Sequence, residues 1–310
     1  MLLVTGATGY LGSALVDLLV RRGEAVRAAV RDPVRAAAVL PEGVELAVAD
    51  LADPGDGASL RAAARGCSGV LHLAGSVGHS RDETRRSNVE GTRAMLTAAA
   101  EAGVPRFVYT SSSAAVMDAS GLVSENPSGP PALTDAYSVS KAEAEKLVLA
   151  AAGDGLHATI VNPVGVYGPS PRGPLSYNGL LLAAARGEID VVVDAPVGWV
   201  LAEDAAAGHL LALEKGELGR RYVLCGEVAP FGRVLHTFAE QVGSPHRVRT
   251  LPPGSSLPDD AGTFARRSQV YGAFPPVHIE DAQACGLGFA PRGVAEGLRL
   301  TAEWVTQQAV

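Results

Sequence analysis

A glycine-rich turn near the start of the chain constrains the fold more than any other feature. Gly6, Gly9 and Gly12 form a G-x-x-G-x-x-G pattern that follows the apolar run Leu2–Thr5 and opens an amphipathic segment. In a strand–turn–helix unit, such glycines allow a tight turn, a close approach of the backbone to a pyrophosphate, and close packing of the helix. The free N–H groups and the positive dipole end of the helix favour phosphate. We therefore expect a dinucleotide at this turn, rather than a plain strand-to-helix connection.

Apolar runs and amphipathic segments alternate through the first half of the chain. This alternation predicts a parallel sheet with helices on both faces, which is the doubly wound α/β class. Ligands of such sheets bind at the carboxyl ends of the strands. The expected strands are Leu2–Thr5, Ala25–Val30, Val44–Val48, Gly69–Leu73 and Arg106–Thr110, and the expected helices are Tyr10–Arg22, Val34–Leu40, Ala58–Ala64 and Thr84–Ala102.

The pattern loosens in the second half, where Pro and Gly become frequent and regular segments become shorter. We expect a nucleotide-binding Rossmann domain over residues 1–165, with segments near 195–225 returning to it. Residues 166–310 are expected to form a smaller, partly discontinuous substrate lobe. The regular segments expected beyond the first half are the strand Ala158–Val161, the helix Ala202–Lys215 and the strand Arg221–Leu224.

The composition excludes several classes of protein. A net charge of −7 over 310 residues argues against a nucleic-acid-binding protein, which would need a basic face. No apolar run approaches the ~18–20 residues that span a bilayer, and the N-terminus is predicted to be a buried strand rather than a signal peptide. Cys67, Cys225 and Cys285 are far apart and lack metal-ligand spacing, so we expect a cytoplasmic protein with reduced thiols, no metal site and no membrane partner.

A tyrosine and a lysine lie one helical turn apart in the segment Tyr137-Ser-Val-Ser-Lys141. A nearby positive charge favours the phenolate, so the lysine is expected to lower the pKa of the tyrosine. Such a tyrosine can exchange a proton with a hydroxyl or carbonyl group near neutral pH. A serine run, Ser111-Ser112-Ser113, follows the fifth expected strand and could orient a substrate oxygen. Counting from the strand favours Ser112, with Ser113 as the alternative.

The end of the second expected strand bears on the choice of cofactor. Arg31 stands where an arginine would accommodate a 2′-phosphate, whereas an acid there would bind the ribose 2′-hydroxyl. We therefore expect NADP, used as NADPH, and keep NAD as the alternative; Arg31 could instead be a solvated charge while Asp32 caps the next helix. Asp50 follows the third strand and could bind the adenine amino group or cap a helix. His72 is expected to be a packed strand-end residue.

Nine segments together resemble the extended branch of the short-chain dehydrogenase/reductase superfamily, the NAD-dependent epimerase/dehydratase family. They are T-G-A-T-G-Y-L-G (5–12), D-L (50–51), H-L-A-G (72–75), N-V-E-G-T (88–92), Y-T-S-S-S (109–113), Y-S-V-S-K (137–141), N-P-V-G-V-Y-G-P (162–169), W-V-L-A-E-D-A-A-A-G-H (199–209) and G-L-G-F-A-P-R (286–292). The resemblance implies catalytic roles for Ser112, Tyr137 and Lys141. Besides the glycines and Arg31, it implies cofactor contacts from Thr8, Tyr10, Leu11, Asp50, Leu51, Leu73, Ala74, Gly75, Asn88, Thr110, Tyr137, Lys141, Pro163 and Val166.

Departures from the patterns of this branch narrow the chemistry. Sugar-nucleotide dehydratases of this kind carry a Thr followed by an acid where this chain has A-A at 114–115, so dehydration is not expected. The segment T-I-V-N-P at 159–163 lacks the arginine that the epimerases usually carry. Its Asn-Pro pair and the V-R-D-P at 30–33 are more similar to the dihydroflavonol-reductase-like group, whose members reduce ketones or aldehydes with NADPH.

We therefore expect an NADPH-dependent reductase of a small-molecule carbonyl compound. Tyr137 would donate the proton, Ser112 would position the oxygen, and Lys141 would tune Tyr137 and bind the nicotinamide ribose. The alternatives are a sugar-nucleotide epimerase with tightly retained NAD, which Arg172, Arg266 and Arg267 keep open, and a non-enzymatic cofactor-sensing regulator. The family resemblance also implies a homodimer through the helices Thr84–Ala102 and Tyr137–Ala152. Candidate substrate contacts are Ser76, Val77, Ser113, Met117, Tyr167, Tyr177 and Trp199.

Overall fold

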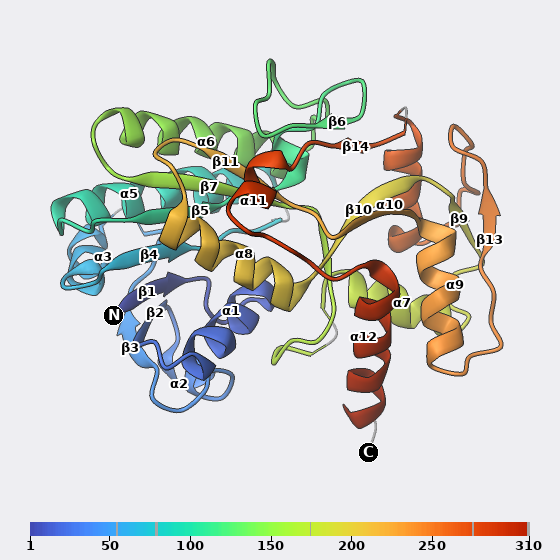
Figure 1. Cartoon of the computed structure of the whole chain (residues 1–310), viewed down its shortest axis with the longest axis horizontal. Helices are drawn as coiled ribbons and strands as arrows, with labels where there is room; N and C mark the ends of the chain where they lie inside the picture. The colour runs from blue at the N-terminus through green and yellow to red at the C-terminus, as the bar shows by residue number, and fades with distance from the viewer. Residues whose placement is uncertain (54, 78–79, 174, 275, 309–310) are drawn as a thin grey trace.

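The centre of the molecule is a seven-stranded parallel sheet (Figure 1). The computed structural model describes residues 1–53, 55–77, 80–173, 175–274 and 276–308. The strand order is β11-β7-β5-β4-β1-β2-β3, so the chain reverses its direction across the sheet between β1 and β4. This doubly wound sheet confirms the fold class predicted from the sequence. Its strands are β1 (Leu2–Thr5), β2 (Val26–Val30), β3 (Glu45–Val48), β4 (Gly69–His72), β5 (Phe107–Thr110), β7 (Ala158–Pro163) and β11 (Arg221–Leu224).

Helices cover both faces of the main sheet. Helices α1 (Tyr10–Arg21) and α8 (Ala202–Lys215) pack together over one face, where they share a hydrophobic core with β1, β2 and β11. Helices α3 (Gly57–Ala64), α5 (Gly91–Glu101) and α6 (Ala136–Gly153) cover the other face. The strands are therefore buried on both sides, as their continuous apolar runs predict.

Two expected helices differ from the structure in their extent. The helix expected over Val34–Leu40 is the short α2 (Pro33–Ala37), which begins at Pro33 because the side chain of Asp32 accepts the Arg35 N–H at 3.0 Å. The helix expected over Thr84–Ala102 is divided. Helix α4 (Arg81–Arg85) runs into a π-helical turn, Arg86–Glu90, before α5 begins.

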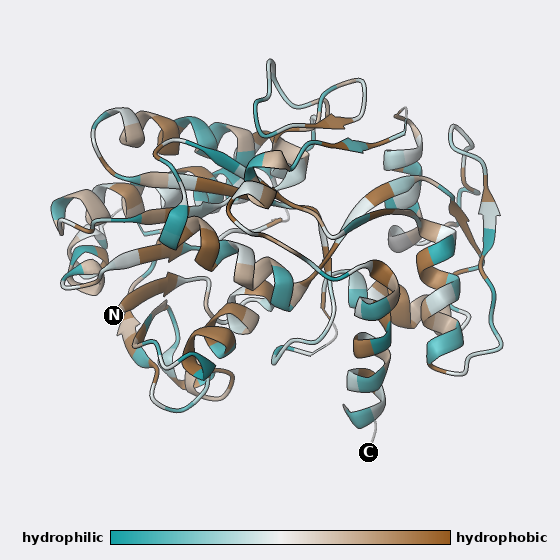
Figure 2. Cartoon of the chain, in the orientation of Figure 1, coloured by the Kyte–Doolittle hydropathy of each residue, from teal (hydrophilic) through white to brown (hydrophobic). Residues whose placement is uncertain are grey.

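Most of the remaining elements form a smaller part on the right of Figure 1. They are β8 (Gly165–Tyr167), β9 (Val191–Val193), β10 (Pro196–Leu201), β12 (Glu227–Pro230), β13 (Arg249–Leu251), α7 (Tyr177–Ala185), α9 (Phe231–Gln241), α10 (Thr263–Gly272) and α12 (Val294–Gln308). Strand β10 pairs with β8 and β12 there, so it is α8 and β11, and not the segment from residue 195, that return to the main sheet. In Figure 2, α9 and α12 show both hydrophobic and hydrophilic positions, as helices with one buried face do.

Four short elements pack beside the main sheet and share its hydrophobic core. They are β6 (Leu122–Val123), β14 (His278–Ile279), α11 (Ala282–Gly286) and a 3₁₀ turn, Ser113–Ala115.

Among the described residues, none of the helices combines the length and the apolar character needed to cross a bilayer.

The backbone around the glycine turn is packed so tightly that Gly6 and Gly12 leave no room for a side chain. A Cβ atom at Gly12 would lie 2.0 Å from the carbonyl oxygen of Gly6. Gly6 itself has φ +68°, and a Cβ there would lie 2.6 Å from the backbone nitrogen of Ala74. The first turn of α1 is therefore held directly against the ends of β1 and β4.

We predict that Gly12→Ala lowers the free energy of unfolding by about 2 kcal/mol or more, because the methyl group meets backbone that cannot yield. Gly57→Ala is the matched control, since Gly57 opens α3 with no neighbouring atom within 4 Å of the added Cβ. The control should be neutral or stabilising by up to about 1 kcal/mol. Urea denaturation of both variants measures the difference, and equal stabilities would contradict the packing argument.

Candidate active site

The first turn of α1 has the geometry of a dinucleotide site. Gly9 precedes α1 and provides no side-chain cap, so the helix N–H groups are left for another acceptor. Small residues of the β4 loop lie opposite: a Cβ at Gly75 would come within 3.1 Å of the Lys141 ammonium and of Asn88 Oδ1. A surface that excludes even methyl groups and presents free backbone donors fits a pyrophosphate and its riboses.

The side chain of Tyr10, one of the expected cofactor contacts, also joins two parts of the molecule. The Tyr10 hydroxyl donates to the carbonyl of Gly168 at 2.6 Å and accepts from Asn178 at 3.0 Å. The loop after β8 is further joined to α1 by the Ser170 hydroxyl, which donates to the Tyr10 carbonyl at 3.0 Å. Tyr10 therefore links the smaller part to the nucleotide-binding turn. Thr8 is half-buried in the turn, and Leu11 packs against the core.

Two of the charged residues on and just after β2 have partners among the described residues, and one does not. Asp32 is used as the cap of α2, and Arg27 is paired with Glu45 at 2.6 Å. Arg31 is exposed, and its side chain has no hydrogen bond or ion pair within the described parts of the chain. The Asp50 carboxylate accepts the N–H of Ala52 at 3.0 Å. Of these groups, Arg31 is the cation left to meet an anion.

Tyr137, Lys141 and Ser112 come together from two elements. Asp135 caps α6 by accepting the N–H groups of Tyr137 and Ser138, both at 3.1 Å, which fixes the first turn of the helix. One turn later, buried Lys141 donates from Nζ to the carbonyl oxygen of Thr110 at 2.7 Å, at the tip of β5. Ser112 lies just beyond that tip, close enough to Tyr137 for its hydroxyl to lower the pKa of the phenol.

The electrostatics of this group differ from the sequence-based expectation. Burial raises the pKa of Tyr137 above its ordinary value, and the hydrogen bond with Ser112 opposes that rise. The expected lowering by Lys141 is wrong, because desolvation of the phenolate dominates. Burial also lowers the pKa of Lys141 to about 8, opposed by the negative charge of Glu145. A phenol with a raised pKa is protonated at neutral pH and suits a proton donor.

The π-helical turn carries a further polar contact of the site. Asn88 is fully buried and donates from Nδ2 to the Ser76 carbonyl and to the Ser140 hydroxyl, both at 2.9 Å. Its Oδ1 accepts the N–H of Ser76 at 2.7 Å. Asn88 thus joins the loop after β4 to α6. Turns of this kind are frequent at functional sites, and the helical periodicity of the sequence does not reveal them.

His72 belongs to a hydrogen-bond chain beneath the glycine turn. Thr92 donates to the carbonyl of Asn88, so its oxygen accepts from His72 Nε2 at 3.1 Å. The neutral ring then accepts at Nδ1 from Thr5 Oγ1 at 2.7 Å, and the same Thr5 oxygen accepts the N–H of Ala74. Burial lowers the pKa of His72 to about 3, so the ring is neutral. It is a packed strand-end residue, as expected.

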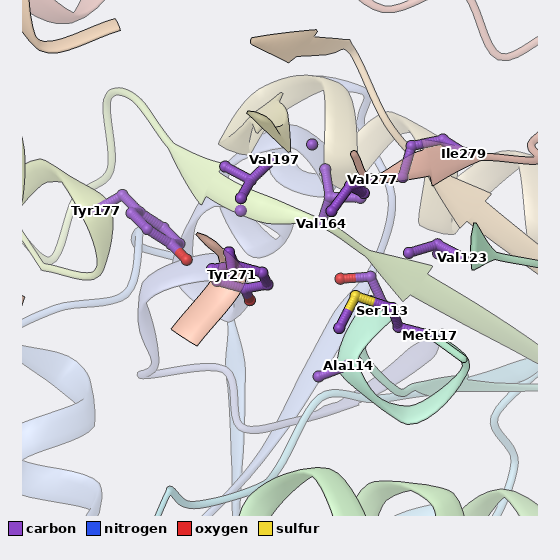
Figure 3. A pocket seen from close by; sticks show the side chains of 12 residues that line it. Ser113, Ala114, Met117, Val123, Val164, Tyr177, Val197, Tyr271, Val277 and Ile279 are labelled. Atoms are coloured by element: carbon purple, nitrogen blue, oxygen red, sulfur yellow. The ribbon is translucent and has the colours of Figure 1, made fainter. Parts of the chain in front are cut away.

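A small cavity of about 20 Å³ lies beyond the serine run (Figure 3). In Figure 3, Tyr177 and Tyr271 stand together on one side, and Ser113, Ala114 and Met117 on the other. The volume has room for about one water, so a substrate can enter only if wall side chains move. The cavity is lined by Ser113, Ala114, Met117, Val123, Val164, Gly165, Tyr177, Val197, Gly198, Tyr271, Val277 and Ile279.

The candidate substrate contacts do not all meet at this cavity. Ser113, Met117 and Tyr177 line it. Tyr167 and Trp199 are instead fully buried in the core of the smaller part, where the Trp199 indole donates to the Ala229 carbonyl at 3.0 Å.

Two further candidates lie elsewhere in the loop after β4. Val77 is exposed, and Ser76 is bound to Asn88.

Tyr271 is a cavity residue that the sequence reasoning missed. It lines the cavity together with Tyr177, and the guanidinium of Arg267 lies 5.6 Å from the centre of the Tyr177 ring. Burial raises the pKa of Tyr177, so this phenol is neutral. Tyr271, Val277 and Ile279 come from a part of the chain without a recognisable motif, and only the tertiary fold brings them here.

The expected cofactor contacts at the tips of the later strands also have definite places. Thr110 uses its hydroxyl to bind buried His209 at 2.9 Å and its carbonyl to bind Lys141. Pro163 ends β7, and Val166 lies on β8. Leu51 packs beside Gly91 at the start of α5. Within the described ranges, no three His, Cys, Asp or Glu side chains gather to hold a metal ion.

Comparison with known proteins agrees with this geometry. Residues 2–225 match the model of the NAD dependent epimerase/dehydratase family. Sterol demethylase protein B of Methylococcus capsulatus is 38% identical over 81% of this chain and 77% of its own length. A Synechocystis sp. protein provisionally named dihydroflavonol 4-reductase is 32% identical over 97% of this chain and 84% of its own. The structure of MoeE5 in complex with UDP-glucose and NAD matches with a TM-score of 0.79 and 29% identity, covering 100% and 99% of the two chains.

We predict that the buried ammonium of Lys141 makes stability depend on pH. Its pKa is about 8 in the folded chain, below the 10.5 of an exposed lysine. The folded chain therefore loses this proton first, and the free energy of unfolding rises between about pH 8 and pH 10.5. Lys141→Met lacks this titration. Urea denaturation at several pH values should show the wild type gaining stability relative to Lys141→Met across that window, and a constant difference would contradict the burial of the charge.

Proposed function

The chain belongs to the NAD dependent epimerase/dehydratase family, and we propose that within this family it is an NADPH-dependent carbonyl reductase. Its substrate would be a ketone or aldehyde group on a small, largely apolar molecule. The observation that carries the proposal is the convergence of Tyr137, Lys141 and Ser112 at the tip of β5, next to an apolar cavity that Ser113 and Ala114 line.

The residues of the chain divide the work of such a reduction. Ser112 Oγ accepts the N–H of Ala114 at 3.2 Å, which fixes the hydroxyl beyond the tip of β5, from where it would donate to a substrate oxygen. Tyr137 is protonated at neutral pH and gives its proton to that oxygen as negative charge develops there. Lys141, fixed by the Thr110 carbonyl, supplies a positive charge that stabilises the phenolate left behind.

The cofactor-binding surface follows from the same contacts. The glycine turn and the N-terminus of α1 would hold the pyrophosphate, Arg31 the 2′-phosphate and Lys141 the nicotinamide ribose. Leu73, Ala74 and Gly75 leave room along the strand tips. When bound, NADPH supplies the hydride that the protein itself cannot provide.

The wall of the cavity favours an apolar substrate. Among its described lining residues none is charged, and the polar groups are the hydroxyls of Ser113, Tyr177 and Tyr271. Two relatives carry names that refer to sterols and dihydroflavonols. Both are classes of largely apolar ring compounds, which fits this wall.

Sugar-nucleotide epimerisation with retained NAD is the second candidate. The similarity to MoeE5, solved with UDP-glucose and NAD, favours it. A diphosphate would need cations, and Arg267 lies beside the cavity at the Tyr177 ring. The uncharged wall and the free Arg31 support the reductase instead. A cofactor-sensing regulator would bind the nucleotide and turn over no carbonyl compound.

The assembly and location of the protein stay predictions. A homodimer would form through α5 and α6, and light scattering of the purified protein measures its mass directly. The division into a nucleotide-binding domain and a substrate lobe, and the cytoplasmic location, likewise rest on the sequence.

We predict that Tyr137→Phe keeps NADPH binding and lowers turnover by roughly 10²–10⁴-fold, because the variant lacks the proton donor. Tyr222→Phe is the matched control. Tyr222 lies on β11, and its hydroxyl accepts the backbone N–H of Glu217. NADPH oxidation with a panel of ketones and aldehydes measures both variants. Turnover of Tyr137→Phe near the wild-type rate would show that another group donates the proton.

We predict that Arg31→Ala weakens NADPH binding by roughly tenfold to a hundredfold and leaves NADH binding unchanged. The reason is that Arg31 would contact only the phosphate that distinguishes the two nucleotides. Calorimetry on protein first checked for retained nucleotide measures this, with the exposed Arg22→Ala as control. Equal loss for both nucleotides, or NAD retained through purification, would favour the NAD-dependent alternative.

A further inference from the structure

We propose that Glu145 is a positioning residue of the active site, whose buried negative charge keeps Lys141 in its charged form. The proposal rests on the reductase function proposed above, because that chemistry requires a cation beside Tyr137. It concerns a group that takes no part in the chemical steps described so far.

The carboxylate of Glu145 is enclosed by its partners. It lies on α6 one turn after Lys141 and is 2% exposed. Its Oε1 accepts from Asn162 Nδ2 at 2.7 Å, and its Oε2 accepts from Arg221 Nε at 2.7 Å. A buried charge is tolerated only when it is paired and hydrogen-bonded, and both conditions are met here.

Asn162 connects the same carboxylate to the serine loop. Its Nδ2 also donates to the carbonyl of Ser112 at 3.0 Å, so both amide protons point at acceptors. The opposite amide orientation would place oxygen against two oxygens. With the amide in this orientation, the buried Oδ1 of Asn162 has no partner in the described residues. An unpaired buried acceptor costs stability, and the two hydrogen bonds from Nδ2 to Ser112 and Glu145 offset that cost.

The aromatic and histidine side chains near Lys141 are neutral, so Glu145 is the group that opposes its positive charge. The ammonium lies 4.9 Å from the centre of the Tyr109 ring on β5, and neutral His72 faces it from β4. His209 on α8 is also buried and neutral, because burial lowers its pKa to about 4.

Tyr137 on α6 is protonated, and Arg221 on β11 contacts the far oxygen of Glu145. Burial lowers the pKa of Lys141 to about 8, and the charge of Glu145 opposes this lowering.

The lysine content of the chain makes the proposal directly measurable. The sequence contains three lysines: Lys141, Lys146 and Lys215. Protein labelled with ¹³C at lysine Cε therefore gives three signals, and Lys141→Met assigns the one of interest. Lys146 and Lys215 are exposed and act as internal references. The titration needs neither cofactor nor substrate, so it is independent of whether the chain is a reductase.

Two variants separate charge from structure. Glu145→Gln and Arg221→Gln break the same ion pair, but only the first removes the negative charge. We expect Glu145→Gln to lower the titration midpoint of Lys141 by about one pH unit or more, while Arg221→Gln does not lower it. The alkaline limb of kcat/KM should move in the same direction for Glu145→Gln alone.

The proposal is overturned if the Lys141 midpoint stays in place in folded Glu145→Gln, or if both variants lower it equally. If Glu145→Gln does not fold, the double variant Glu145→Gln/Arg221→Gln carries the same test, because no arginine is then left unpaired. An unmoved alkaline limb together with a shifted Lys141 midpoint would contradict the reductase mechanism and leave the electrostatic assignment standing.

Discussion

The hydrogen bond from the Lys141 ammonium to the carbonyl oxygen of Thr110 holds the reactive part of this molecule together. It joins the first turns of α6, which carry Tyr137, to the tip of β5, beyond which Ser112 lies. A second link between the same two parts of the site runs from Glu145 on α6 through Asn162 to the carbonyl of Ser112. A lysine meets the need because its compact ammonium is a point donor whose charge responds to burial. Three of the 26 basic residues of the chain are lysines, and one of them is here.

Much of this arrangement could be predicted because it is local in sequence. The glycine turn, the strand–helix alternation and the spacing of Tyr137 and Lys141 each depend on neighbouring residues. The lowered pKa expected for Tyr137 was wrong because spacing reports proximity and says nothing of desolvation. The π-helical turn around Asn88 was missed because a single turn of five residues is too short to show a period of its own.

The substrate side was predicted less well, for a physical reason. Trp199 and Tyr167 look like binding residues in a sequence, yet large aromatic side chains stabilise a core equally well, and the structure uses them to fill the smaller part. Tyr271 and Ile279 reach the cavity from segments more than 100 residues beyond the catalytic pair. Such contacts depend on the tertiary fold alone. Under the function proposed above, specificity would depend on which side chains of the small, uncharged cavity move aside, beginning with Tyr177 and Tyr271.

The reductase proposal requires that hydride passes from NADPH to the substrate carbonyl and leaves the protein in the reduced product. An epimerase would instead return the hydride to the sugar from which it was taken. The most direct test supplies NADPH deuterated at the transferred position together with a cyclic aryl ketone, and follows the label by mass spectrometry. The account predicts one deuterium at the new carbinol carbon for each NADPH oxidised. Inversion of a sugar nucleotide without net cofactor oxidation or label transfer would contradict it.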